Sequence, residues 1–257
     1  MKIIDTHAHL DQLENLDQAM QNAVEAGVDG IVLVSMNLAS CRKNLEIKKR
    51  VKQPKIYLAM GTHPAEVNLG ELGECLKFIR SQREHLIAVG EIGLDFWYKW
   101  VKKDLAKQQE QIQSFTKHLE LAKELNLPAI IHSRGAWKEC LDIVGKIGLK
   151  KALFHWYSGP VDILKNILDA GCYVSTSPSL AYSPQSREAM SVAPIERILI
   201  ETDSPVHFKT DSGGGGFTAE PKDVVRTLKA YCALKNVDEQ KALDIFNQNA
   251  KQFFNLN

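Results

Sequence analysis

The sequence predicts an α/β fold: a single (β/α)8 barrel of the TIM type that spans residues 1–257. Two observations predict this fold. Short apolar runs recur along the chain, and amphipathic helical patterns lie between many of them. A length of 257 residues suits one such barrel, which typically needs ~250 residues. A third observation, that metal-ligating residues follow several of the apolar runs, indicates where a functional site lies.

The apolar runs are the candidate strands. They are rich in β-branched residues and too short for helices. Their hydrophobicity is continuous rather than alternating, which is typical of parallel strands that are covered on both faces. The eight runs are residues 3–4, 31–34, 56–59, 86–89, 129–131, 152–154, 172–174 and 198–200.

The patterns between the runs predict helices with recognisable ends. A helix over residues 16–26 ends at Gly27, a residue suited to a C-cap. The longest, residues 105–125, is followed by Pro128, which cannot continue a helix. An open, doubly wound sheet is the alternative fold, although no GxGxxG motif follows the first run to support it. The other predicted helices are residues 141–147, 161–170, 221–234 and 238–254.

The charge of the chain excludes one class of nucleic-acid-binding protein. Lys and Arg together number 32, and Asp and Glu number 31, which gives a formal net charge of +1. This is not the basic composition of a protein that grips duplex DNA by charge alone. A nuclease is not excluded, because bound metal ions supply positive charge at the scissile phosphate.

The cysteines and the first residues predict a cytoplasmic protein. The five cysteines are dispersed without a CxxC pair, so we expect reduced thiols rather than disulfides. The first apolar run is cut short by Asp5, which leaves it too short for a secretory signal. Because no apolar run approaches the ~18 residues of a membrane span, we expect no contact with a membrane. The sequence indicates no obligate protein partner.

Two histidines after the first run point to a metal site. His7 and His9 lie at the end of an expected strand, where residues two apart share a face. Both imidazoles can therefore converge on one ion. The alternative is a pair of surface histidines, so the prediction depends on what the other strand ends carry.

Further metal-ligating residues directly follow other runs. In a barrel, the carboxyl ends of the strands form one rim, which is where such folds place their active sites. A lone histidine there is more often a core or surface residue, and a lone aspartate is more often a helix cap. Their repetition favours a ligand set for two divalent ions, and these ligand types suit zinc, manganese or magnesium. The residues are Glu91, His132, His155 and Asp203.

These residues lie in motifs that occur in a fixed order from residue 2 to about residue 254. In order and spacing, the motifs resemble those of the TatD-type metal-dependent hydrolases of the amidohydrolase superfamily. The resemblance implies one metal-dependent hydrolase domain over residues 1–257. The matching stretches are DTHAHL (5–10), GTHP (61–64), GEIGLD (90–95), PAIIHSR (128–134), HWYSG (155–159), ETDSP (201–205) and NQNA (247–250).

The resemblance also implies roles for the candidate ligands. His7, His9 and Asp203 would hold one divalent ion, and His132 and His155 would hold the second. Glu91 would bridge the two, since a carboxylate has an oxygen for each ion. We expect metal-assisted hydrolysis with Asp203 as the general base, because its carboxylate can touch both an ion and the attacking water.

For the substrate, the resemblance implies DNA. The expected activity is that of a deoxyribonuclease that hydrolyses phosphodiester bonds, working from 3′ to 5′ on single-stranded DNA or 3′ ends. The candidate substrate-binding residues are His63, Asp95 and Arg134. Arg134 suits a phosphate through its forked guanidinium, and a surface position at a helix start is an equal alternative. The aromatic side chains of the loop at residues 96–100, which are interleaved with Lys99, either stack bases or pack the loop onto the barrel.

Two departures from the family pattern lie where substrate is expected. A glycine run, Gly213 to Gly216, stands in place of an Arg-Gly motif and is either a substrate-facing loop or an inert linker. Bulky Trp156 and Tyr157 follow His155. These departures keep open a hydrolase of a small ester, lactone or amide from the same superfamily. A non-catalytic metal-binding protein is a third hypothesis.

Overall fold

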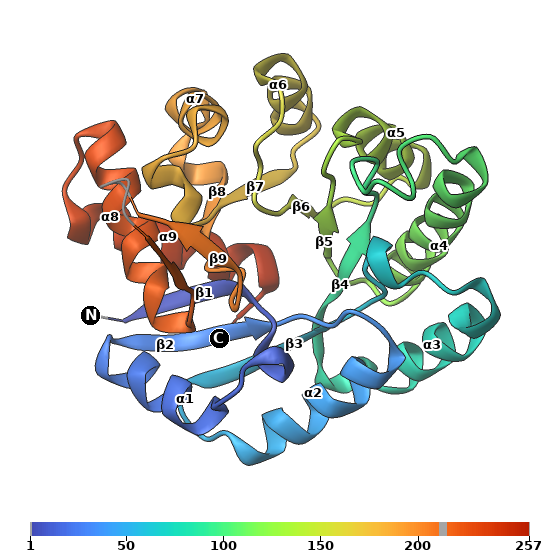
Figure 1. The fold of residues 1–257 in the computed structure, drawn as a ribbon, viewed down its shortest axis with the longest axis horizontal. Coiled ribbons are helices and arrows are strands. Elements are labelled where there is room, and N and C mark those ends of the chain that lie inside the picture. The colour runs from blue at the N-terminus through green and yellow to red at the C-terminus, as the bar shows by residue number, and fades with distance from the viewer. Residues whose placement is uncertain (1, 211–214, 257) are drawn as a thin grey trace.

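The structure is a computed structural model that describes residues 2–210 and 215–256. Within these ranges, eight parallel strands form one sheet in chain order and curl into a nearly closed (β/α)8 barrel of the TIM type (Figure 1), as predicted. The strands are β1 (Ile3–Ala8), β2 (Val28–Leu33), β3 (Lys55–Met60), β4 (Leu86–Gly93), β5 (Ala129–His132), β6 (Ala152–Phe154), β7 (Tyr173–Thr176) and β8 (Ile198–Ile200).

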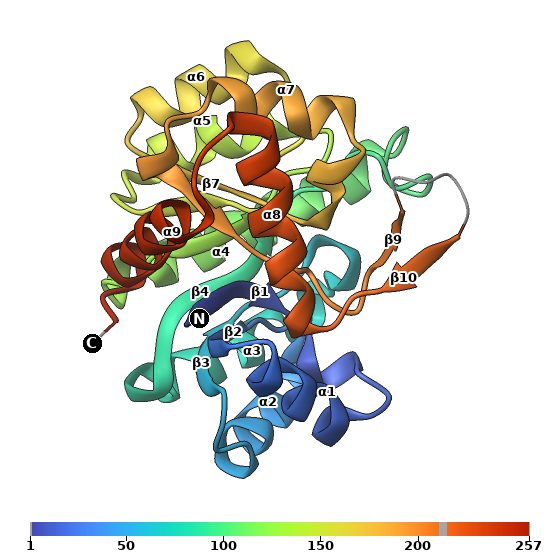
Figure 2. The same ribbon diagram turned by 90° about the vertical axis from the view of Figure 1, so that its left-hand side faces the viewer.

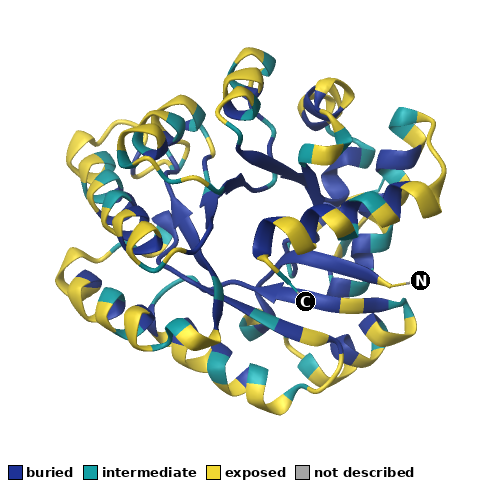
Figure 3. Ribbon diagram, turned by 180° about the vertical axis from the view of Figure 1, so that it is seen from behind, coloured by how far each residue is buried: buried dark blue, intermediate teal, exposed yellow. Residues whose placement is uncertain are grey.

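Helices surround the sheet and bury their inner faces against it (Figure 3). The sequence did not predict α2, α3 or α7. Each nevertheless starts with a side-chain cap: Asn37, Asn68 and Ser183 accept hydrogen bonds from backbone N–H groups of the first turn. The helices are α1 (Leu16–Glu25), α2 (Leu38–Arg50), α3 (Leu69–Ser81), α4 (Leu105–Glu124), α5 (Trp137–Ile147), α6 (Val161–Asp169), α7 (Pro184–Val192), α8 (Val224–Lys235) and α9 (Glu239–Phe254).

A short antiparallel hairpin follows β8 and projects from the barrel (Figure 2). It consists of β9 (His207–Lys209) and β10 (Gly216–Thr218), with Phe208 paired to Phe217. Gly213 and Gly214 of the predicted glycine loop lie outside the described residues, whereas Gly216 begins β10. The hairpin was not predicted from the sequence, because each of its strands is only three residues long.

The barrel closes where β1 meets the segment after β8. The backbone N–H of His9 donates to the carbonyl of Ser204 (2.8 Å), and the N–H of Asp203 donates to the carbonyl of His7 (2.9 Å). Buried Asp5 adds side-chain bonds to this seam, accepting from the N–H of Thr202 (2.9 Å) and from its hydroxyl (2.6 Å). The seam therefore joins two segments that carry predicted metal ligands.

The opposite end of the barrel is covered by α9. Its residues Ala250, Phe253 and Phe254 pack into one apolar cluster with inward-facing strand residues such as Ile4 and Leu199. The Nδ2 of Asn249 donates to the carbonyls of Ile195 (2.7 Å) and Ile198 (2.8 Å), which fixes the helix beneath β8. This end is sealed by apolar packing, which leaves the carboxyl-end rim as the open end.

All five cysteines are free thiols, and each is buried. Within the described ranges, every helix is too short or too polar to cross a membrane.

We predict that Phe253→Ala lowers the free energy of unfolding by about 3–5 kcal/mol, because it empties a fully buried site at the sealed end of the barrel. Urea denaturation measures the change. The matched control is Gln252→Ala on the exposed face of the same helix, which should stay within about 0.5 kcal/mol of the wild type. An equal effect of the two variants would contradict this role for α9.

Candidate metal centre

The six predicted ligands meet at the carboxyl-end rim. Their side chains are buried except for that of His132, which is partly exposed. Since every one of them lies near the carboxyl end of a strand, the register of the barrel brings them together. His7 lies in β1 and His9 follows it, Glu91 lies in β4, His132 ends β5, His155 follows β6, and Asp203 follows β8.

Four of these residues form the first cluster. The Nε2 atoms of His7 and His9 lie 3.4 Å apart. Each lies 3.3 Å from Glu91 Oε2 and 3.4 Å from Asp203 Oδ1. The donor atoms of His7, His9 and Asp203 all lie within 4.8 Å of one another, and imidazole nitrogens and carboxylate oxygens are the ligands that zinc takes in proteins. The donors therefore fit a divalent ion.

The second cluster forms around the other oxygen of Glu91. Glu91 Oε1 lies 2.9 Å from His132 Nδ1 and 2.7 Å from His155 Nε2. These two nitrogens lie 3.4 Å apart. One carboxylate thus turns one oxygen to each cluster, which is the geometry that a bridging ligand needs.

Two buried carboxylates orient the histidines of the second cluster. Asp95 Oδ2 accepts from His132 Nε2 (2.8 Å), which leaves Nδ1 to face Glu91. Glu201 Oε1 accepts from His155 Nδ1 (3.2 Å), and Ser175 holds the second oxygen of Glu201 (2.6 Å). Partners of this kind fix the tautomer and the ring orientation of metal-binding histidines.

The placement of Asp95 differs from what its predicted contact with substrate requires. Asp95 is fully buried behind His132. Its carboxylate accepts hydrogen bonds from His132 and from Arg134 Nε (2.8 Å). No role was predicted for Glu201 from the sequence. Its signal was its position, since it directly follows β8 and is a carboxylate at a strand end.

His63 stands beside the second cluster in a different chemical state. Its Nδ1 accepts from the N–H of Ala65 (3.0 Å), so the neutral ring carries its proton on Nε2. That Nε2 lies 3.5 Å from Glu91 Oε1 and 3.3 Å from His132 Nδ1. Burial lowers the pKa of His63 to about 3 and keeps the ring neutral. His63 therefore offers an N–H donor rather than a lone pair for a metal ion.

The histidines and carboxylates of the centre stabilise one another's charged forms. Burial disfavours the charged form of His9, but hydrogen bonds to Asp203 and Glu91 outweigh it and raise its pKa to about 10. Burial likewise disfavours the ionised form of Glu91, and the surrounding histidines more than compensate, holding its pKa well below the usual range. Glu91 is thus ionised, and a divalent ion would displace protons from the imidazoles.

The backbone at Asp203 is strained. Its φ of +52° places a non-glycine residue in the left-handed region, which costs on the order of 1 kcal/mol and persists where the surroundings fix it. The seam hydrogen bond from Asp203 N–H to His7 supplies such a restraint. The strained turn directs the carboxylate to His7 and His9.

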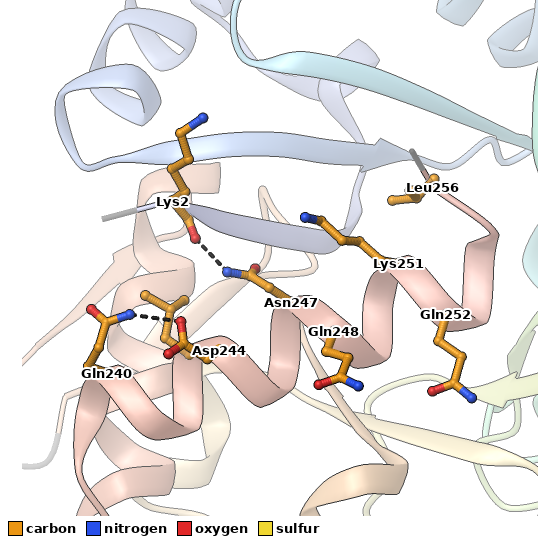
Figure 4. Close-up of a pocket in the computed structure, with 9 residues that line it drawn as sticks. Lys2, Gln240, Asp244, Asn247, Gln248, Lys251, Gln252 and Leu256 are labelled. Carbon is orange, nitrogen blue, oxygen red and sulfur yellow. Dashed lines mark hydrogen bonds between the residues drawn. The ribbon is translucent and has the colours of Figure 1, made fainter.

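A cavity of about 680 Å³ opens over both clusters. Predicted substrate residues His63 and Arg134 line it, together with Trp97, Trp137 and Trp156. Another hollow, of about 980 Å³, lies on the outer face of α9 (Figure 4). Its described lining consists mainly of amide, lysine and leucine side chains, so it does not gather metal-ligating groups.

A parallel barrel that collects imidazoles around a shared carboxylate at its carboxyl-end rim defines a class of protein, the metal-dependent barrel hydrolases. The family model described as TatD related DNase matches residues 4–255, and the chain belongs to this family.

Individual relatives agree with this membership. An uncharacterized metal-dependent hydrolase of Methanocaldococcus jannaschii is 30% identical over 99% of this chain and 97% of that protein. The deoxyribonuclease TATDN3 of Homo sapiens is 27% identical over 98% of this chain and 94% of that protein. The crystal structure of YJJV, a TatD homolog of Escherichia coli K12, has the same fold with a TM-score of 0.88, at 23% identity over 99% of this chain and 98% of that one.

We predict that Glu201→Gln weakens divalent-metal binding by about 10- to 100-fold, because His155 loses the carboxylate that orients it. Competition with a chromogenic chelator measures the affinity, and circular dichroism checks the fold. Glu196→Gln, an exposed glutamate just before β8, should bind metal as the wild type does. Unchanged affinity in Glu201→Gln would remove Glu201 from this role.

Proposed function

We propose that this metal-dependent hydrolase is a deoxyribonuclease that uses two divalent ions to cut phosphodiester bonds. The observation that carries the proposal is the placement of Glu91, with one oxygen toward each cluster. His7, His9 and Asp203 would hold one ion, and His132 and His155 would hold the other, so that residues 1–257 act as one hydrolase domain. Magnesium, manganese and zinc all suit this nitrogen and oxygen ligand set.

The chain's own groups supply positioning and proton transfer. Bound divalent ions would lower the pKa of water and neutralise charge on the phosphate. Asp203 is our candidate for the general base, because only Oδ1 takes part in its contacts with His7 and His9, which leaves Oδ2 for the attacking water. Nε2–H of His63 donates to a phosphoryl oxygen, and the guanidinium of Arg134 reaches the same phosphate from the cavity wall.

The dimensions of the cavity favour cleavage at the end of a DNA strand. A space of about 680 Å³ is typical of a small-ligand site, and it suits a terminal nucleotide better than the middle of a duplex. We therefore propose 3′–5′ exonuclease action on single-stranded DNA. The human relative named as a deoxyribonuclease supports a DNA substrate. A cytoplasmic location and action without an obligate protein partner remain predictions.

A hydrolase of a small ester, lactone or amide is the second candidate. Trp156 favours it, because this bulky residue narrows the cavity directly after His155. Digestion of 3′-labelled single-stranded DNA on a gel, with and without EDTA, separates the two. Metal-dependent shortening of the label supports the nuclease. Intact DNA together with turnover of a small ester would replace it, and inactivity on both would favour a metal-binding protein.

Replacing the proposed base should stop turnover. We predict that Asp203→Asn lowers the rate of DNA hydrolysis by about 100-fold or more, since proton transfer by a positioned base contributes at least that factor. The fold should persist by circular dichroism. Asp169→Asn, at the exposed end of α6, serves as the control with wild-type turnover. Near-normal turnover in Asp203→Asn would exclude the base role.

His63 should affect catalysis without affecting metal content. We predict that His63→Ala lowers kcat/KM for DNA by about 100-fold, the cost of losing one donor to a developing negative charge. Metal analysis of the purified variant should give the wild-type metal content, because Nε2 carries a proton instead of a lone pair. Loss of a metal ion from this variant would instead identify His63 as a ligand.

A further inference from the structure

The loop between β4 and α4, residues 94–104, lies beside the cavity and exposes large aromatic side chains. Trp97 is 55% exposed and Trp100 is 45% exposed. Trp97 and Tyr98 also line the cavity over the metal centre. Exposed tryptophans are costly in water, so their position at the mouth of a binding cavity points to a ligand with flat apolar surfaces.

The aromatic side chains of this loop are held in place by packing contacts with one another and with residues that follow β5. Trp97 lies against Gly135, where an added Cβ would come within 2.3 Å of the indole and where φ is +73°. It also meets Trp137 edge-on, with 5.5 Å between ring centroids. Tyr98 packs between the guanidinium of Arg134, 4.8 Å from its ring centroid, and the Trp100 ring at 4.4 Å. The platform is therefore preformed, which lowers the entropy cost of binding.

Asp95 joins this platform to the metal centre. Its Oδ1 accepts from the backbone N–H groups of Trp97 (3.0 Å) and Tyr98 (3.2 Å). Its Oδ2 accepts from His132 Nε2. One carboxylate thus fixes both the aromatic loop and a proposed metal ligand, and it places the platform at a defined position relative to the site of cleavage.

The same loop also carries positive charge on exposed lysines. Lys99, Lys102 and Lys103 are exposed. Across the described ranges, none of the three ammonium groups forms an ion pair or a hydrogen bond. Exposed aromatic rings interleaved with free cations are the combination by which proteins bind single-stranded nucleic acid, through base stacking and phosphate contacts.

We propose that the β4–α4 loop is a docking surface for single-stranded DNA, which binds the nucleotides on the 5′ side of the bond to be cut. Bases stack on Trp97 and Trp100, and the three lysines contact the phosphates. This inference rests on the proposed nuclease function for its placement next to the cleavage site. Duplex DNA is a poor fit, because its bases already stack on one another.

The test uses the metal-loaded protein and a 12-nucleotide oligo(dT) with phosphorothioate linkages that resist hydrolysis. Fluorescence anisotropy of a 5′ label gives Kd. We expect Trp97→Ala and Trp100→Ala each to weaken binding about tenfold, in line with stacking on one ring. An abasic oligomer of equal length should bind the wild type more weakly than oligo(dT), and Trp100→Ala should lose that preference.

The lysines are tested through salt dependence. Replacing Lys99, Lys102 and Lys103 by alanine should reduce the slope of log K against log salt by about 2, since each single-strand phosphate contact contributes ~0.7. The matched control removes three exposed lysines from outer helices, Lys77, Lys146 and Lys165, and should keep the wild-type slope.

The possible outcomes separate this inference from the proposed function. Wild-type Kd and slope in the loop variants, in an enzyme that digests DNA, would overturn the docking surface and leave the nuclease intact. Loop-dependent binding in a protein that does not cut DNA would reject the nuclease but keep the surface. Trp97 packs on both Gly135 and Trp137, whereas Trp100 makes an edge contact with Tyr98, so Trp100→Ala is the variant that disturbs the loop less. Tighter binding of a duplex of the same length would reject the single-strand assignment.

Discussion

The backbone seam between β1 and the segment after β8 is the constraint on which the rest of the structure depends. It closes the barrel through hydrogen bonds of His7, His9, Asp203 and Ser204. His7, His9 and Asp203 also belong to the first cluster of candidate ligands, so closing the barrel brings these three ligands together. The strained φ of Asp203 persists because the seam fixes it from both sides.

Beyond this seam, buried carboxylates connect and orient the other residues of the rim. Glu91 faces both clusters, Glu201 holds His155, and Asp95 holds His132, Arg134 and the aromatic loop. Each of these carboxylates is buried and has both oxygens engaged, which stabilises its charge in a low-dielectric site. The geometry of the centre therefore depends on a network, and a change at one carboxylate reaches a neighbouring element.

Much of this arrangement could be predicted from the sequence, because strand ends are a local feature. An apolar run followed by His132 or His155 identifies a rim position without knowledge of its neighbours. The distinct roles of Asp95 and Glu201 could not be predicted in this way. They depend on which side of a histidine ring the carboxylate occupies, and that follows from packing between strands far apart in the sequence.

The fold was predictable to a similar degree. The barrel follows from the repeated apolar runs, whereas α2 was missed because its buried face includes Ser40, Cys41 and Asn44. The side chain of Asn44 donates to the carbonyl of Val34, and this tertiary hydrogen bond allows a polar residue to lie in the core. Hydrophobic periodicity does not detect helices whose buried faces carry polar residues that form such hydrogen bonds.

The location of α9 and of Asp203 late in the chain has a consequence for biosynthesis. His7 and His9 emerge from the ribosome early, whereas their hydrogen-bond partners Asp203 and Ser204 lie nearly two hundred residues downstream. Until α9 emerges, the barrel lacks the helix that seals its lower end. Contacts of such long sequence separation form late. A nascent or truncated chain would therefore lack a complete hydrolytic centre, and the cell would not carry an active fragment of this enzyme while it is being made.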